Sequence, residues 1–396
     1  MSARENRPYD LVLLGATGFT GRLTAAYLAE HAPAELRWAL AGRNRTRLED
    51  VRRELVEAHP DAGLDDLPLL SADSTDAASL GELAESTRVL VTTVGPYVAH
   101  GAPVVAACAA AGTDYLDLTG EPEFVDRMYL AHHEEAVASG ARLVHCCGFD
   151  SIPHDLGAYF TVQQLPEGEP VTMRGVVRAG ASFSGGTFHS ALAAFSRGRH
   201  MAAAMKQRRA AEGRPEGRSV RASAGRPHRD SVTGYWLLPL PTIDPFVVTR
   251  SAAALERYGP RFTYSHYAGT RTLRYAAGGA AGMAALLGAA QVPPLRRAIL
   301  SRVPAGEGPS ASRRQKSWFT VDFVGQAGGV TTRTRVSGGD PGYDETAKML
   351  AESAMCLALD DNPASAGQVT TAVAMGENLL ARLQNAGIRF EVVAGR

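Results

Sequence analysis

The chain has 396 residues, more than one compact core usually holds, which predicts two domains. Its 41 Lys and Arg balance 41 Asp and Glu, so the overall charge does not favour a nucleic-acid partner. Cys108, Cys146, Cys147 and Cys356 form no Cys-x-x-Cys pair, so we expect neither a disulfide framework nor a metal site. The polar N-terminus 'MSARENRPYD' lacks the apolar core of an export signal, which favours a cytoplasmic protein.

Residues 1–150 alternate between short apolar strands, such as 'DLVLLGA' and 'RVLVTTVG', and helical stretches, such as 'GRLTAAYLAEH'. Strands that are apolar on both faces and separated by helices indicate a parallel sheet covered on both sides. We therefore predict an α/β fold with a Rossmann-type, doubly wound parallel sheet in 1–150.

The first predicted strand runs into 'GATGFTG', which places Gly15, Gly18 and Gly21 at three-residue spacing before a helix. In this strand–turn–helix context, Gly15 makes a tight turn, Gly18 admits a phosphate and Gly21 lets helix and strand pack closely. A pyrophosphate then binds at the helix N-terminus. The predicted cofactor contacts in this loop are Gly15, Ala16, Thr17, Gly18, Phe19, Thr20 and Gly21.

The second strand indicates which dinucleotide binds. An NAD site usually carries a carboxylate at this strand's end, but 'ALAGRNRTRL' offers Arg43 and Asn44 instead, with Arg47 nearby. A guanidinium can hold a 2′-phosphate and stack on adenine, so we predict NADP(H). Asp73 is expected near the adenine amine. Val94, Gly95, Pro96 and Gly120, which follow later strands, complete the predicted cofactor site.

Candidate catalytic groups follow the same strands in 'VGPYVAHG', 'DYLDLTGE' and 'CCGFDSIPHDLG'. Tyr97 and Ser151 could donate a hydrogen bond to an oxyanion, and His154 titrates near neutrality, as a general acid should. Asp150 would either orient His154 or cap the following helix. No Tyr-x-x-x-Lys and no Gly-x-Ser-x-Gly motif occurs, which excludes the usual signals of short-chain dehydrogenases and of serine hydrolases.

Residues 151–342 are predicted to form a substrate-binding α+β domain on a mixed or antiparallel sheet, with a hairpin around 'QAGG'. The Arg- and Gly-rich segment 196–234 is expected to be a mobile insertion, either simply solvated or a docking surface for an anionic carrier. The uncharged segment 275–295 predicts a helix that packs in the core or at a subunit interface, with membrane contact as the alternative. Residues 343–396 are expected to complete the first domain.

These motifs, with 'SGGT' at 184–187 and 'AMGENLLARLQNAGIRFEVV' near the end, resemble the saccharopine dehydrogenase-like oxidoreductases over nearly the whole chain. Within that family the chain is similar to the trans-acting enoyl reductases. The resemblance implies an NADP-dependent reduction of an α,β-unsaturated polyketide or fatty-acyl thioester in lipid biosynthesis. The implied partner is a polyketide synthase or acyl carrier protein. The acyl chain would need an apolar channel, for which the Ala- and Gly-rich helix of 275–295 and Trp236, Leu237 and Leu238 are candidates.

Two other functions remain open from the sequence. A saccharopine-type amino-acid reductase would need arginines to bind the carboxylates of its substrate. A non-catalytic NADP-binding scaffold would use the apolar helix of 275–295 to contact lipid surfaces. A homodimer and a peripheral membrane location are further alternatives, and no nucleic-acid partner is expected.

Overall fold

The structure is a computed structural model that describes residues 3–181, 192, 196–302 and 308–395. The chain divides into two compact units. The first comprises Met1–Gly148, Gly306–Gly308 and Tyr343–Arg382, and the second comprises Phe149–Ala305, Pro309–Gly342 and Leu383–Arg396. Each unit is built around its own β-sheet.

The first unit contains a seven-stranded sheet in the order β14-β6-β5-β4-β1-β2-β3, in which every pairing is parallel. Without β14, this is the strand order of a Rossmann fold. The predicted fold class is therefore confirmed. The strands are β1 (Tyr9–Leu14), β2 (Trp38–Gly42), β3 (Leu69–Ser71), β4 (Thr87–Thr92), β5 (Asp114–Asp117), β6 (Arg142–Val144) and β14 (Gly367–Val369).

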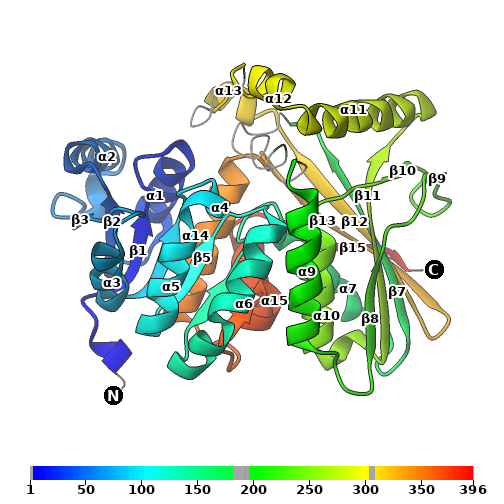
Figure 1. Cartoon of the computed structure of the whole chain (residues 1–396), viewed down its shortest axis with the longest axis horizontal. Helices are drawn as coiled ribbons and strands as arrows, with labels where there is room; N and C mark the ends of the chain where they lie inside the picture. The colour runs from blue at the N-terminus through cyan, green and yellow to red at the C-terminus, as the bar shows by residue number, and fades with distance from the viewer. Residues whose placement is uncertain (1–2, 182–191, 193–195, 303–307, 396) are drawn as a thin grey trace. The chain divides into compact units, whose positions relative to one another are not determined.

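Helices connect these strands, as a parallel sheet requires (Figure 1). The helix α14 packs against α1 and against the central strands β1, β4 and β5, while α5 packs between α3 and α6. The helices are η1 (Ala3–Asn6), α1 (Phe19–His31), α2 (Arg45–Ala58), η2 (Pro60–Ala62), α3 (Ala77–Ser86), α4 (Tyr97–His100), α5 (Ala102–Ala111), α6 (Pro122–Ser139), α14 (Asp344–Leu359), α15 (Thr371–Ala374) and α16 (Gly376–Asn385).

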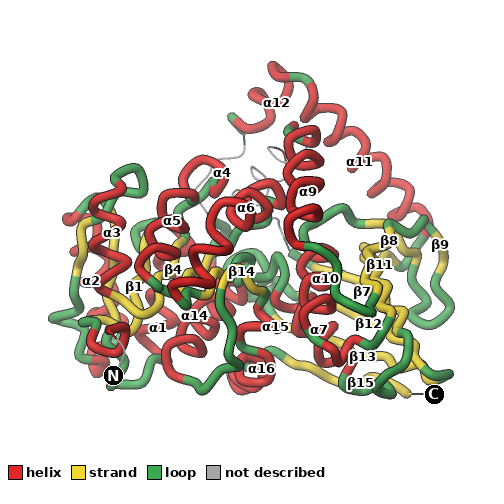
Figure 2. Tube along the Cα trace, turned by 60° about the horizontal axis from the view of Figure 1, so that its bottom comes forward, coloured by secondary structure: helices red, strands yellow, loops and turns green. Residues whose placement is uncertain are grey.

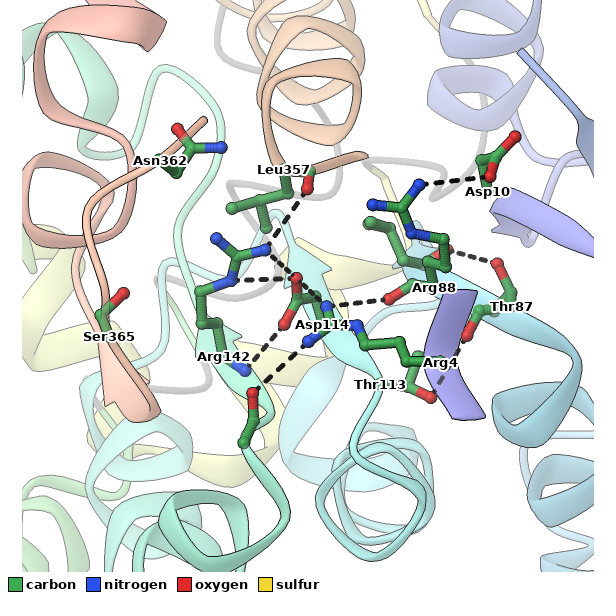
Figure 3. Close-up of polar contacts among 12 residues, drawn as sticks. Arg4, Asp10, Thr87, Arg88, Thr113, Asp114, Arg142, Leu357, Asn362 and Ser365 are labelled. Atoms are coloured by element: carbon green, nitrogen blue, oxygen red, sulfur yellow. Dashed lines mark hydrogen bonds and ion pairs between the residues drawn. The ribbon is translucent and has the colours of Figure 1, made fainter. Parts of the chain in front are cut away.

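A polar network joins the amino ends of the central strands (Figure 3). Asp114, fully buried at the start of β5, accepts hydrogen bonds of 2.9 Å from the backbone N–H and from Nε of Arg142. Arg4 forms an ion pair with the same carboxylate. A buried carboxylate needs such partners, so the network stabilises the edge of the sheet opposite the glycine loop.

The second unit contains a mixed sheet in the order β15-β13-β12-β7-β11-β10-β9, with β8 pairing parallel to β11. The predicted hairpin is confirmed, because β12 and β13 pair antiparallel around Gly328 and Gly329. Both glycines have positive φ, as tight hairpin turns require. The strands are β7 (Val171–Ala179), β8 (Ser219–Ser223), β9 (His228–Arg229), β10 (Trp236–Pro239), β11 (Arg261–Thr270), β12 (Phe319–Ala327), β13 (Val330–Gly338) and β15 (Arg389–Gly395).

Along the chain, one helix of the second unit precedes β7 and the others lie in the connections between later strands. Figure 2 shows α7 and α10 beside the strands of this sheet. The helix α7 packs against β12 and β13, and α10 packs against α7, β8 and β11. Their bounds are α7 (Ile152–Val162), α9 (Gly198–Glu212), α10 (Asp244–Ala254), η3 (Glu256–Tyr258), α11 (Leu273–Gln291), α12 (Pro293–Leu300) and α13 (Ala311–Arg314).

Two segments differ from the sequence expectation. The last strand, β15, pairs with β13 in the second sheet, so Leu383–Arg396 does not complete the first unit. Segment 196–234 contains α9, β8 and β9, and both strands join the second sheet. Backbone pairing gives this segment its structure although it has few bulky apolar residues. Its mobility stays a prediction.

The helix predicted in 275–295 is α11, and it is not a core helix. Only Ala276 and Ala290 of its 19 residues are buried. No single described helix has the length and hydropathy of a membrane span, and α11 and α12 reach them only as a pair bent by 113°. Leu237, expected in an acyl channel, is instead buried with Val176 and Tyr267 in a core cluster of the second sheet.

Candidate functional site

The glycine loop of the first unit has no room for side chains at two of its glycines. Gly15 has a φ of +90°, and a Cβ there would lie 2.8 Å from both Thr93 Oγ1 and Val94 Cγ2. A Cβ on Gly21 would lie 2.2 Å from the carbonyl oxygen of Gly15. The backbone of β1 and α1 therefore approaches closely only because these residues are glycines.

The same loop presents a helix N-terminus. Gly18 caps α1 with extended backbone and no side-chain hydrogen bond, and its N–H donates to the Gly15 carbonyl at 3.0 Å. The first turn of a helix carries N–H groups without intrahelical partners, and its dipole favours an anion. A dinucleotide pyrophosphate fits this cradle, with Ala16, Thr17 and Thr20 on either side of the capping glycine.

Three predicted cofactor residues follow β2 and β3. Arg43 is exposed directly after β2. Asn44 accepts a hydrogen bond of 3.0 Å from the Arg47 N–H and so caps α2, which gives its side chain a structural role. Asp73 accepts from the N–H and hydroxyl of Thr75, and these hydrogen bonds, with smaller contributions from Arg43 and His100, lower its pKa. Arg43 and Asp73 therefore lie in one electrostatic environment.

The remaining predicted contacts follow β4 and β5. Val94 lies against Gly15, and Gly95 and Pro96 lead into α4. Gly120 precedes α6, whose first turn begins after Glu121. All of these residues follow carboxyl ends of parallel strands, where open α/β sheets bind ligands. The predicted cofactor residues thus lie along one edge of the first sheet. The motif at 184–187 lies outside the described residues.

The structure gives Tyr97 a different role from the expected proton donor. Its buried hydroxyl donates to the Thr92 carbonyl at 3.1 Å and accepts from the Leu118 N–H at 3.2 Å. Burial raises the pKa of Tyr97 well above its usual value. A hydroxyl already bonded to two backbone groups is not available to an oxyanion, so Tyr97 fixes the loops after β4 and β5.

A buried Asp–His pair in the first unit is absent from the sequence prediction. Asp117 Oδ2 lies 2.6 Å from His145 Nδ1 and accepts from the Tyr115 hydroxyl at 2.9 Å. Oδ1 accepts from the N–H groups of Thr119 and Cys146, each at 3.0 Å. His145 Nε2 has no hydrogen-bond partner among the described residues. Asp117 ends β5 and His145 follows β6, so the rule that carboxyl ends meet at one edge could have found this pair.

A second buried Asp–His pair lies in the second unit. His154 Nδ1 is 3.0 Å from Asp244 Oδ1, and His266 Nε2 is 3.5 Å from Asp244 Oδ2. Burial alone would raise the pKa of Asp244, but His154 and, less strongly, His266 hold it below its usual value. Burial lowers the pKa of His266 to about 4. His154 Nε2 has no hydrogen-bond partner within the described parts of the chain.

Ser151 belongs to the same cluster. Its hydroxyl donates to Asp244 Oδ1 at 3.4 Å, and the side chain is fully buried. Of the three predicted catalytic residues, His154 is thus the one with a ring nitrogen, Nε2, that has no hydrogen-bond partner among the described residues. Asp244 and His266 were not predicted, because they come from α10 and β11, far along the chain, and no motif marks them.

Asp150 interacts electrostatically with this cluster rather than capping α7. Burial and the nearby Asp244 charge raise its pKa to about 6. The folded protein therefore binds more protons than the unfolded chain between about pH 4 and pH 6, so stability falls as pH rises through that window.

The variant Asp150→Asn tests this shift. We expect it to be about 1–3 kcal/mol more stable than wild type at pH 8 and to lose that advantage near pH 4, as measured by urea denaturation at both pH values. An Asp150→Asn advantage independent of pH would contradict the raised pKa.

The cluster also has metal-ligand chemistry, since His154, Asp244 and His266 place ligand atoms within 4.8 Å of one another. For comparison with this limit, the ligand atoms around a tetrahedral zinc ion with bonds of about 2.0–2.2 Å lie about 3.4 Å from one another. The sequence predicts no metal. Elemental analysis of purified protein tests that expectation.

Comparisons with known proteins agree with this arrangement. Residues 11–144 match the model of the saccharopine dehydrogenase NADP binding domain. A Mycobacterium tuberculosis protein, provisionally named a trans-acting enoyl reductase, is 38% identical over 97% of both chains. A trans-acting enoyl reductase of Mycobacterium bovis is 36% identical over 96% of this chain and 97% of its own. A solved saccharopine dehydrogenase (L-Glu forming) from Saccharomyces cerevisiae superposes with a TM-score of 0.57 at 12% identity, covering 98% of this chain and 100% of that one.

The yeast structure establishes the fold, and the full-length relatives establish the family. The glycine cradle satisfies the requirement of the matched domain for a dinucleotide. The chain is thus an NAD(P)-binding oxidoreductase of the saccharopine dehydrogenase-like family and belongs, within it, to the trans-acting enoyl reductases.

Proposed function

We propose that this protein is an NADP-dependent enoyl reductase that acts in trans on an α,β-unsaturated polyketide or fatty-acyl thioester in lipid biosynthesis. The observation that carries the proposal is the full-length identity of 36–38% to relatives named as trans-acting enoyl reductases. Identity that extends over both units includes the second unit, the expected substrate-binding part, as well as the glycine loop of the first.

The preference for NADP(H) rests on Arg43. It is exposed directly after β2, where an NAD site usually has a carboxylate. Among the described residues no salt bridge or side-chain hydrogen bond engages its guanidinium, so it is available to a 2′-phosphate. Arg43 contributes to the lowered pKa of Asp73, and the Asp73 carboxylate is already bonded to Thr75.

Arg43→Glu tests the cofactor preference. We expect at least about a tenfold loss of NADPH affinity with little change for NADH, because the variant replaces a phosphate-binding cation with a repelling anion. Tryptophan or nicotinamide fluorescence titration measures both constants. Lys206→Glu, the same charge change at an exposed position of α9, should leave the ratio of the two constants unchanged. An Arg43→Glu protein that still prefers NADPH would refute the role of Arg43.

The chemistry needs a hydride at Cβ of the acyl chain and a proton at Cα. The bound nicotinamide supplies the hydride. We assign the proton to His154, because its Nδ1 lies 3.0 Å from the carboxylate of Asp244 and its Nε2 has no hydrogen-bond partner among the described residues. The surrounding burial excludes water, which strengthens electrostatic stabilisation of the developing enolate.

We propose that the acyl thioester is presented by a polyketide synthase or acyl carrier protein in the cytoplasm. Carrier proteins have acidic faces, and α9 exposes Arg199, Lys206 and Arg209 to solvent. If α9 docks the carrier, reversing these three charges raises KM for the carrier-bound substrate and leaves KM for the matching CoA thioester unchanged.

NADPH oxidation tests the proposed function directly. Purified protein should oxidise NADPH with 2-enoyl thioesters on CoA or a carrier and not with the matching saturated thioesters. Turnover with an amino acid and a semialdehyde instead would show a saccharopine-type reductase. NADPH binding without turnover on any of these substrates would show a scaffold.

A further inference from the structure

The helices α11 and α12 form an exposed apolar element of the second unit. Their large apolar side chains face solvent: Leu273 is 56% exposed, Tyr275 62%, Leu287 38%, Val292 46% and Leu295 47%. Between Arg274 and Arg296 the sequence has no charged residue. A soluble protein seldom leaves so long an apolar surface uncovered, so something outside the described chain is expected to cover it.

The rest of the described second unit covers little of α11. The helix lies beside β10 and β11, and Gly279 comes close enough to Leu238 that a Cβ there would lie 3.5 Å from its Cδ1. By contrast, Gly278, Gly282 and Gly288 have open space where a Cβ would stand. Figure 1 shows α11 at the margin of the second unit, with one long side away from the sheet.

Cations flank the apolar element at both ends. Arg271 and Arg274 are exposed at the start of α11, and Arg297 and Arg302 are exposed on and just after α12, with Arg296 half-buried. The sequence has no Asp or Glu from 257 to 306. Arg296 donates to the Ala290 carbonyl of α11, and Arg297 and Arg302 donate to carbonyls of α12; within the described residues, none of the three forms a salt bridge. Their charges are therefore available to an anionic partner.

The charge pattern selects among the possible occupants. A two-fold contact between copies places the same patch on both sides, so the arginines of one copy would face those of the other and repel them. An anionic bilayer matches both properties, because its phosphates attract the arginines and its acyl boundary accepts the apolar side chains. The bend of 113° between α11 and α12 suits helices that lie along the surface.

We propose that α11 and α12 form a docking surface for an anionic lipid bilayer, with Leu273 and Leu287, which lie on one face of α11, in the acyl boundary and Arg296, Arg297 and Arg302 on lipid phosphates. This surface attaches the protein peripherally to a membrane. The proposal does not depend on the identity of the reduced substrate.

Vesicle co-sedimentation of the full chain tests the proposal. The protein should sediment with vesicles of equal parts phosphatidylcholine and phosphatidylglycerol, and much less with phosphatidylcholine alone. High salt should weaken the binding, because it screens the charges. Arg296→Glu/Arg297→Glu/Arg302→Glu should lower partitioning to anionic vesicles at least about tenfold. Leu273→Ser/Leu287→Ser should lower it as well.

The control variant Arg199→Glu/Lys206→Glu/Arg209→Glu carries the same change in net charge on exposed positions of α9 and should sediment like wild type. Circular dichroism checks that each variant is folded. Wild-type protein that stays in the supernatant, or a charge-reversed α12 variant that binds as well as the control, overturns the proposal. A dimer in light scattering that the α11 substitutions dissociate also overturns it, in favour of a second copy.

Discussion

Gly21→Ala is expected to weaken NADPH binding by about 3 kcal/mol, or about 100-fold. The added Cβ would lie 2.2 Å from the Gly15 carbonyl oxygen and 2.9 Å from Ala16 Cα. Both are backbone atoms, so no side-chain rotation can relieve the contact. Relief of the clash requires α1 to move away from the loop after β1. The backbone N–H groups that are expected to hold the pyrophosphate would then no longer converge.

Gly81→Ala provides the matched control, because it makes the same chemical change in α3. A Cβ at Gly81 meets no atom within 4 Å, so alanine should stabilise the helix by about 0.5–1 kcal/mol. Fluorescence titration with NADPH, together with thermal unfolding of both variants, measures the two effects. A folded Gly21→Ala protein with wild-type NADPH affinity would show that the cofactor does not bind at this loop.

His154→Gln is expected to lower kcat for enoyl thioester reduction about 100-fold or more while the Kd for NADPH stays unchanged. Glutamine retains the approximate shape of the side chain but cannot supply a proton. The pH profile of kcat should also lose the limb that reports the acid in the enzyme–substrate complex. Steady-state kinetics from pH 5 to 9 measures both effects.

His145→Gln distinguishes catalysis from structural loss. His145 is also buried, also paired with an aspartate and also has an unpartnered Nε2. Both variants remove a buried Asp–His pair, so both should lower the melting temperature. Only the His154 variant should change the pH profile. If His145→Gln shows the kinetic defect and His154→Gln does not, the proton comes from the first unit instead.

The sequence predicts the first sheet well because its strands carry their own signals. Leu11–Leu14 and Ala39–Ala41 are apolar on both faces and are fully or almost fully buried, as a covered parallel sheet requires. The glycine loop is also locally determined, since Gly15 and Gly21 serve backbone geometry within seven residues of chain. The short strand β14 was not predicted, because three residues with one polar side chain give no periodic signal.

Features that depend on distant contacts could not be predicted. Tyr97 follows a strand end in a motif that suggests catalysis, yet its hydroxyl is engaged by backbone groups from two loops. The sequence marks His154 as a candidate, but its partner Asp244 is 90 residues away in the chain. An Ala- and Gly-rich helix such as α11 has the same hydropathy in a core as at a surface, so only the fold reveals its exposure.

The position of a transferred deuterium tests the proposed function most directly. Purified protein is incubated with a carrier-bound 2-enoyl thioester and NADPH deuterated at the transferable C4 position, and the acyl product is analysed by mass spectrometry. The proposed enoyl reduction predicts a saturated acyl chain with a single deuterium at Cβ and a solvent-derived proton at Cα. Deuterium on a carbinol or amine carbon, or NADPH that binds and is never oxidised with any enoyl thioester, would contradict it.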